Sequence, residues 1–173
     1  MRRIIVLLSA VVTVVLAVPT GVTAALAAAP DVNEQDQAFL AALHQGNLAE
    51  IESGKVAEKQ GSIEGVRQAG KTLVDEHNKL DAEVRRVAGE VGVTLPDSPS
   101  DEQQAQLQRI SDKKGAEFDD AWVTAEIADH RDDLKAIADQ QAKGSSAPVK
   151  KLATDAKPVV ESHLNMLEKL HAG

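Results

Sequence analysis

The sequence contains no cysteine and no tyrosine, and its aromatic residues are limited to one tryptophan and two phenylalanines. The absence of cysteine excludes disulfides, thiol catalysis, iron–sulfur clusters and cysteine-ligated zinc, so any bound metal would need nitrogen and oxygen ligands. The scarcity of aromatic side chains disfavours a carbohydrate- or peptide-binding groove, which normally relies on aromatic platforms. The sequence also lacks a glycine-rich phosphate loop and a nucleophile-elbow serine.

Basic residues are in a minority. All 27 acidic residues follow position 27, but only 17 of the 19 basic residues do, so this part of the chain carries a formal charge near −10. Such a charge disfavours nucleic acid, whose phosphates require a basic surface, and it also disfavours anionic membrane surfaces. We therefore expect no nucleic-acid partner.

The N-terminal segment has the pattern of a secretory signal peptide. Arg2 and Arg3 precede an apolar run over 4–18, and Ala25-Leu26-Ala27 supplies the small residues that signal peptidase reads. An uncleaved membrane anchor is the alternative, but the run is shorter than the roughly 20 residues of a full span. We predict a signal peptide at 1–27, a flexible leader at 28–33, and a protein that is secreted or kept in the cell envelope without lipid or membrane insertion.

Apolar residues recur at steps of three and four along most of the remaining chain, without any strand-like alternation. This period predicts an all-α domain over 34–173 with long helices at about 36–60, 63–92, 116–143 and 148–170. Ser62 is expected to cap the second of these helices, and Ser100 with Gln103 forms a capping box for a shorter helix before Gly115. The short turns favour an antiparallel four-helix bundle, while the longer loop after the second helix leaves its handedness open.

Three histidines lie at the centres of three predicted helices and on their apolar faces. His77, His130 and His163 each fall within about one turn of a helix midpoint, as does Glu50 in the first helix. An alternative phase of the first helix would bury Leu48 and Ile51 and leave Glu50 at the edge. We prefer the phase that buries Glu50, because its carboxylate then has histidine partners.

Imidazole and carboxylate groups at one level suit one divalent transition metal, such as zinc, copper or iron. Glu126 precedes His130 by one turn and can face the same way, whereas Glu76 is expected to point elsewhere. A di-iron centre is not predicted, because neither His77 nor His163 has a glutamate three residues before it. His44 and His171 are expected on the surface, and Phe118 and Trp122 in the core.

The chain also resembles a known bacterial family, domain of unknown function 4142, over about residues 34–171. The segments that carry the resemblance are Phe39 with Asn47-Leu48-Ala49-Glu50 and Gly54, Leu73-Val74-Asp75-Glu76-His77, Leu95-Pro96, Gly115-Ala116-Glu117-Phe118-Asp119-Asp120-Ala121-Trp122, Asp129-His130 and His163-Leu164. The resemblance implies an exported bacterial protein with a ferritin-like four-helix bundle. It also implies Glu50, His77, Asp119, His130 and His163 as functional positions. A ferritin-like fold does not itself imply iron.

Two functions follow from these observations. The first is a binding module that holds one metal ion on Glu50, His77, His130 and His163, with Asp119 and Glu126 nearby. Its affinity should fall as the pH drops through roughly 6, because ligation needs neutral imidazole. The alternative is a non-catalytic structural or interaction protein of the cell envelope, whose buried histidines form a polar network and whose acidic faces meet a protein partner.

Overall fold

The computed structural model describes residues 31–172, and within this range the chain is helical with no strand. The helices are α1 (Glu34–Gln60), α2 (Glu64–Val91), α3 (Asp101–Ser111), α4 (Ala116–Lys143) and α5 (Ala147–Ala172). The four long helices agree with the predicted ranges to within about two residues at each end, and α3 is the shorter helix predicted after Ser100. The expected signal peptide at 1–27 and most of the leader at 28–33 lie outside the described residues.

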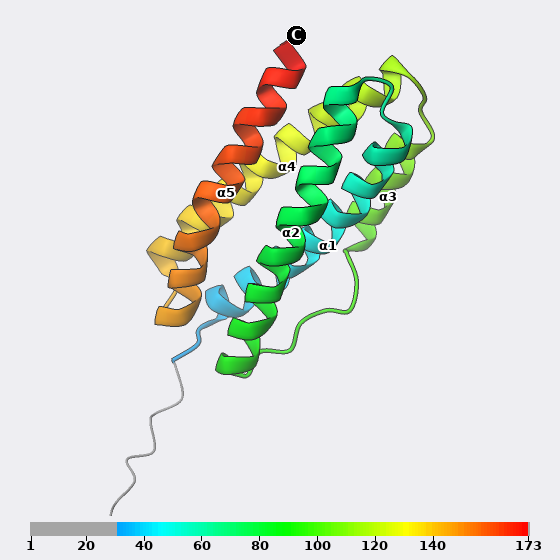
Figure 1. The fold of residues 1–173 in the computed structure, drawn as a ribbon. Coiled ribbons are helices and arrows are strands. Elements are labelled where there is room, and N and C mark those ends of the chain that lie inside the picture. The colour runs from blue at the N-terminus through cyan, green and yellow to red at the C-terminus, as the bar shows by residue number, and fades with distance from the viewer. Residues whose placement is uncertain (1–30, 173) are drawn as a thin grey trace, which may run out of the picture.

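The four long helices pack as a bundle in which neighbouring helices run in opposite directions (Figure 1). One apolar cluster contains the start of α1, the end of α2, the end of α4 and the start of α5. The other cluster contains the opposite ends of the same four helices, with Ile110 of α3. Helices α2 and α4 therefore point the same way, and the connection between them, which includes α3, runs the length of the bundle. The structure thus shows how the longer loop after the second helix runs, which the sequence left open.

Local sequence explains where two of the helices begin. Asn33 and Asp36 form a reciprocal capping box at α1, and Ser100 and Gln103 form the predicted one at α3. The prediction for α2 is wrong: its N-cap is Ile63, which makes no side-chain cap. Ser62 does not cap α2, because its backbone N–H and hydroxyl both donate to the carboxylate of Asp119 on α4.

Helices α1 and α2 approach each other closely at a pair of glycines. A Cβ atom on Gly54 would lie 2.6 Å from the carbonyl oxygen of Gly70, and a Cβ on Gly70 would lie 2.6 Å from that of Gly54. No other residue fits either position without moving a helix backbone, because real side chains do not make contacts this short. The two glycines therefore set the separation of α1 and α2 about two turns from the helix midpoints.

The two apolar clusters are separated by a buried polar layer. In each long helix, buried polar residues lie between the stretches that enter one cluster and those that enter the other. These residues are Asn47, Glu50, His77, Glu126, His130 and His163. Phe118 and Trp122 are fully buried in the core as predicted, while on the same helix Asp119 is buried and Asp120 is exposed.

Helix α5 remains one continuous helix through Pro158. None of the helices within 31–172 combines the length and the apolar content that crossing a membrane requires.

Candidate functional site

The structure brings His77, His130 and His163 together in the polar layer, from α2, α4 and α5 respectively. Their ring centroids lie 5.1 to 5.6 Å apart, and each residue is at most 1% exposed. One nitrogen from each ring can be chosen so that all three lie within 4.8 Å of one another. We call these three residues the histidine cluster.

The outward nitrogens of two rings are held by oxygen acceptors. His77 Nδ1 lies 2.9 Å from the side-chain oxygen of Asn47 and donates its proton there. His130 Nδ1 lies 2.8 Å from the backbone carbonyl of Glu126, one turn earlier in α4, and donates to it. A neutral imidazole carries only one N–H, so both rings must present an Nε2 lone pair on the other side. The Nε2 atom of His77 is buried and has no hydrogen-bond partner.

The third ring completes this arrangement. His163 Nε2 donates to the carboxylate of Glu76 on α2 at 2.7 Å, which leaves a lone pair on Nδ1. That Nδ1 atom lies 3.3 Å from His130 Nε2. When both rings are neutral, each of these two nitrogens carries a lone pair and no proton, so no hydrogen bond can form between them. Lone pairs on His130 Nε2 and His163 Nδ1 therefore face each other, and the neighbouring His77 ring carries a third lone pair on its buried Nε2.

Burial keeps the three rings neutral. It lowers the pKa of His77 well below its ordinary value, and the neighbouring His130 and His163 lower it further. Burial lowers the pKa of His130 to about 4, against the opposing effect of its bond to the Glu126 carbonyl. Burial also lowers the pKa of His163, although Glu76 acts in the opposite direction. At neutral pH the cluster therefore offers unprotonated nitrogen to a ligand.

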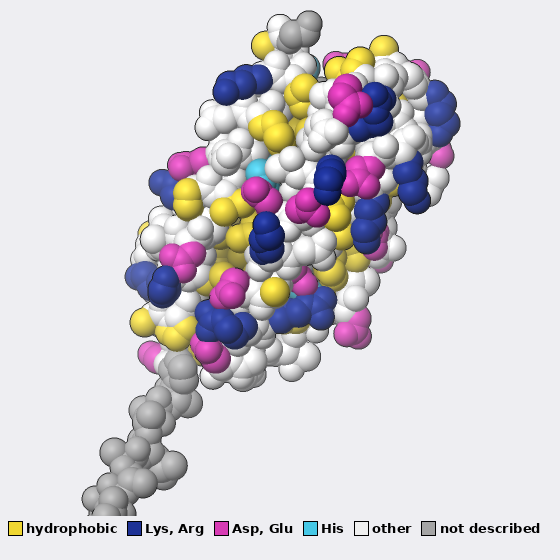
Figure 2. Space-filling view, viewed as in Figure 1, with side chains coloured by type: hydrophobic (Ala, Val, Ile, Leu, Met, Phe, Trp, Pro, Cys, Tyr) yellow, Lys and Arg dark blue, Asp and Glu magenta, His cyan; other side chains and the backbone are white. Residues whose placement is uncertain are grey.

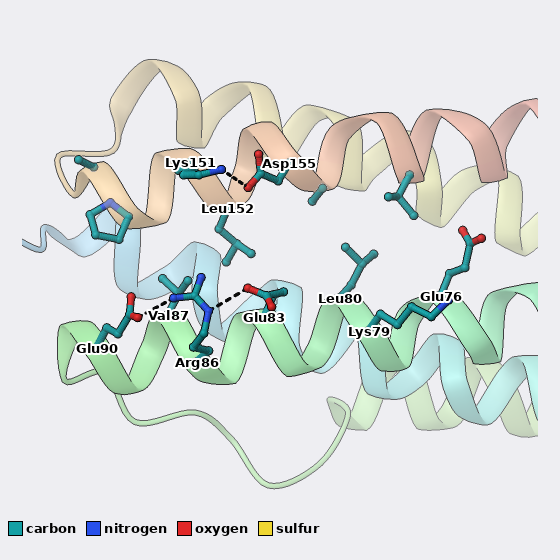
Figure 3. A pocket seen from close by; sticks show the side chains of 14 residues that line it. Glu76, Lys79, Leu80, Glu83, Arg86, Val87, Glu90, Lys151, Leu152 and Asp155 are labelled. Atoms are coloured by element: carbon teal, nitrogen blue, oxygen red, sulfur yellow. Dashed lines mark hydrogen bonds and ion pairs between the residues drawn. The ribbon is translucent and has the colours of Figure 1, made fainter.

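A groove of about 830 Å³ between α2 and α5 reaches the edge of the cluster through Glu76. Leu80, Val87 and Leu152 point into it, with Glu76 at one end (Figure 3). On the surface, yellow hydrophobic side chains lie between α2 and α5, with blue and magenta charged side chains along both edges (Figure 2). The side chain of Glu76, which binds His163, is 40% exposed.

Glu50, predicted in the same site, lies on the other side of His130. Its Oε1 atom is 3.8 Å from His130 Nδ1, the nitrogen that faces away from the other two histidines. Glu50 groups there with Glu126 and His130. The four residues predicted as one site are therefore near each other, but they form two groups that share the ring of His130.

The carboxyl groups of Glu50 and Glu126 are both buried, and burial raises the pKa of each. Glu126 also raises the pKa of Glu50 by charge repulsion. Glu126 Oε1 accepts a hydrogen bond from Ser53, whose hydroxyl oxygen accepts one from Trp122 Nε1 at 2.8 Å. The second oxygen of each carboxyl, Oε2, has no partner.

The structure places three other residues differently from the expectation: His44, Glu76 and Asp119, the last of which was expected near the site. His44, expected on the surface, is 3% exposed and lies 2.5 Å from Asp81, which also pairs with Arg85. Glu76, expected to point elsewhere, binds His163. Consecutive residues on a helix point roughly 100° apart, so Glu76 on α2 faces α5 while His77 points into the cluster. Asp119 lies with Ser62 and belongs to neither histidine group. His171 is exposed, as predicted.

Comparison with known proteins agrees with the helical architecture. A family model described as domain of unknown function (DUF4142) matches residues 21–170. The structure is similar to a crystal structure of a DUF305 fragment from Deinococcus radiodurans, with a TM-score of 0.73 and 12% sequence identity, over 83% of this chain and 99% of that chain. This similarity shows the fold alone. No curated protein matches the chain.

Proposed function

The chain belongs to the family described as domain of unknown function (DUF4142), and on the basis of the histidine cluster we propose that it is a metal-binding protein. His77, His130 and His163 hold one divalent transition metal ion through their inward nitrogens. Zinc and copper are the best candidates, with iron next, because all three ligands are neutral imidazoles.

The proximity of the three lone pairs carries this proposal. For metal–nitrogen bonds of 2.0–2.1 Å and tetrahedral angles, two ligand nitrogens lie about 3.3 Å apart. His130 Nε2 and His163 Nδ1 have this separation. Without a cation the two lone pairs repel each other, and His77 Nε2 remains buried without a partner. One metal ion would satisfy all three nitrogens.

The residues around the cluster support the same proposal. Histidines that bind metals almost always donate their other N–H to a carboxylate, a carbonyl or water, which fixes the ring orientation. Here Asn47, the Glu126 carbonyl and Glu76 accept these three protons. Glu76 is the acidic member, and its carboxylate would make His163 a stronger ligand.

Three protein ligands leave a fourth position for water or another small ligand. The cluster consists of three imidazole ligands, and we propose that its role is to bind or buffer the metal. The groove between α2 and α5 supplies a route toward His163.

We further propose that the protein acts outside the cytoplasmic membrane, on the strength of the signal-peptide pattern at 1–27. We also propose a ferritin-like bundle, since one long connection between the second and third long helices is typical of those folds. N-terminal sequencing of the protein from its host tests the first point: intact Met1 on most of the soluble intracellular protein would contradict it.

The decisive experiment is metal analysis of protein purified from its host without a histidine tag, followed by calorimetric titration with zinc and copper. We expect close to one equivalent of bound metal and a metal-dependent rise in melting temperature. His77→Leu with His163→Leu should abolish both, while His171→Leu should change neither. The alternative, a polar network that only fixes helix register, predicts no binding by the wild type and unchanged or improved stability of the double variant.

A further inference from the structure

A second cavity lies on the opposite side of His130, lined by residues of α1, α3 and α4. Its volume is about 190 Å³, enough for a small number of water molecules or a hydrated ion. Five carboxylate side chains line it, with no basic residue among its lining side chains. They are Glu50, Glu126, Asp129, Asp132 and Asp133. We call this space the acidic cavity.

Two of these carboxyl groups are buried, and each has one oxygen atom without a hydrogen-bond partner. Glu50 is 5% exposed and Glu126 is 3% exposed, and the Oε2 atom of each is buried without a hydrogen bond. A buried carboxylate oxygen that lacks a partner destabilises the fold by a substantial amount. Native proteins rarely keep such atoms unless a proton, water or an ion satisfies them. A cation held between the two carboxylates would satisfy both oxygens at once.

The surrounding charges reinforce this need. Burial is the main cause that raises the pKa of Asp133, to about 7, and repulsion from Asp129, Asp132 and Glu126 adds to it. Burial likewise raises the pKa of Asp129. The acidic cavity thus concentrates negative charge and attracts cations.

We propose that the acidic cavity is a second cation site, which holds a hard divalent cation such as Ca²⁺ or Mn²⁺ between the carboxylates of Glu50 and Glu126. The donors in the cavity are oxygen atoms, which favour hard cations over zinc or copper. His130 supplies no lone pair on this side, because its Nδ1 proton is donated to the Glu126 carbonyl. The side-chain amide of Gln106 on α3, which also lines the cavity, donates to Asp129 at 2.9 Å.

This site differs from the histidine cluster in its chemistry and in its helices. The histidine cluster draws on α2, α4 and α5, with nitrogen ligands, whereas the acidic cavity draws on α1, α3 and α4, with oxygen ligands. Each site can therefore be tested and can fail without the other.

The sequence supplies a reporter for this cavity. Trp122 is the only tryptophan and there is no tyrosine. Its indole N–H donates to Ser53, whose hydroxyl donates to Glu126 Oε1. The indole is thus two hydrogen bonds away from a proposed ligand, within range to sensitise the luminescence of a bound terbium ion, which is a hard cation with the ligand preferences of calcium.

The experiment titrates the metal-free full protein at pH 8 with Tb³⁺, excites Trp122 and then adds Ca²⁺ or Mn²⁺ as competitor. We expect saturable emission at one equivalent that both competitors displace. Glu50→Gln with Glu126→Gln should weaken the binding of Tb³⁺ by roughly a hundredfold or more, since it removes both charged ligands. Asp120→Asn, which removes one exposed charge from α4, the helix of Glu126, is the control.

Calorimetry and melting curves of the wild type with Ca²⁺ and Mn²⁺ decide the matter even if a variant fails to fold. The proposal requires measurable heat and a higher melting temperature with at least one of the two ions. It is overturned if neither ion binds, or if the doubly substituted protein binds Tb³⁺ as the wild type does. Zinc binding in His77→Leu with His163→Leu is measured in parallel, so that a failure at one site is not mistaken for a failure at the other.

Discussion

His163 Nε2 and Glu76 Oε2 lie 2.7 Å apart, and this hydrogen bond joins the buried histidine cluster to the groove between α2 and α5. Glu76 is the only residue that both lines the groove and binds a histidine of the cluster, within residues 31–172. A half-exposed carboxylate thus controls the orientation and basicity of a buried ring.

Replacing Glu76 with Gln should weaken zinc binding by roughly 10–100-fold, the range typical of residues that orient a metal-binding histidine. The substitution keeps the shape of the side chain but removes the negative charge that supports His163. Calorimetric titration with zinc measures the effect. Glu83→Gln, in the same groove but paired with Arg86 rather than with a histidine, should bind zinc as the wild type does. Equal affinities for Glu76→Gln and the wild type would contradict this role.

Zinc affinity should stay nearly constant from pH 8 down to roughly pH 6 and fall only below it. Protons compete with the metal for neutral nitrogen, and an exposed histidine with a pKa of about 6.5 would already lose affinity near that value. Burial lowers the pKa of all three histidines, that of His130 to about 4, so the proton competes at lower pH. Titrations at a series of pH values test this. A midpoint at 6 or above would support the simpler expectation from sequence.

Asp133→Asn should stabilise the metal-free protein at pH 8 and leave it unchanged at pH 4. The pKa of Asp133 is raised by burial to about 7, so between about pH 4 and 7 the folded state holds a proton that the unfolded state has lost. Stability therefore falls as the pH rises through this window. Because Asp133 is partly exposed, we expect a gain of about 1–2 kcal/mol above pH 7.

Urea denaturation with a chelator present measures this gain, and Asp120→Asn serves as control because its side chain is exposed. A gain of the same size at both pH values would show that charge is not its cause.

His44→Ala should lower the free energy of unfolding by about 2–3 kcal/mol, because it leaves the buried carboxylate of Asp81 with Arg85 as its remaining partner. His171→Ala, at an exposed position, should change stability by less than about 0.5 kcal/mol. Chemical denaturation compares the two variants. If His44→Leu with Asp81→Leu restores much of the lost stability, the loss came from the unpaired charge of Asp81. If this double variant is destabilised as much as His44→Ala, a packing defect is the cause instead.

Gly54→Ala should destabilise the fold by about 2–3 kcal/mol, even though alanine favours helix over glycine by about 1 kcal/mol. The added Cβ would lie 2.6 Å from the Gly70 carbonyl oxygen and 2.8 Å from Val74 Cγ2, so α1 and α2 must separate. Gly89→Ala is the control, since nothing lies within 4 Å of its Cβ position and it should gain about 0.5–1 kcal/mol. Thermal melts of the two variants that shift in the same direction would contradict the close approach.

Local pattern was sufficient for most of the fold. The step of three and four residues placed the long helices, and the capping box at Ser100 and Gln103 located α3. The family was also identified from short motifs along the chain, and a family model now confirms it. These features depend on neighbours within a few residues, which the sequence displays directly.

The candidate site could be predicted only in part. That Glu50, His77, His130 and His163 share one buried layer followed from their positions at helix midpoints. Which nitrogen of each ring points inward did not follow, because that depends on acceptors such as Asn47 and Glu76 on other helices. His44 looked like a surface residue for the same reason: its partner Asp81 is 37 residues away on α2.

The sequence by itself therefore determined the helices, their inner faces and the level at which polar residues interrupt the core, because each is a property of one helix and its period. Only the tertiary structure decided that the polar layer divides into a nitrogen-lined cluster and an oxygen-lined cavity on the two sides of His130. This division depends on which helices are neighbours and how each is rotated about its axis. Both are set by packing across the whole bundle, including the close contact of Gly54 with Gly70 and the long connection that carries α3 past α1 and α4.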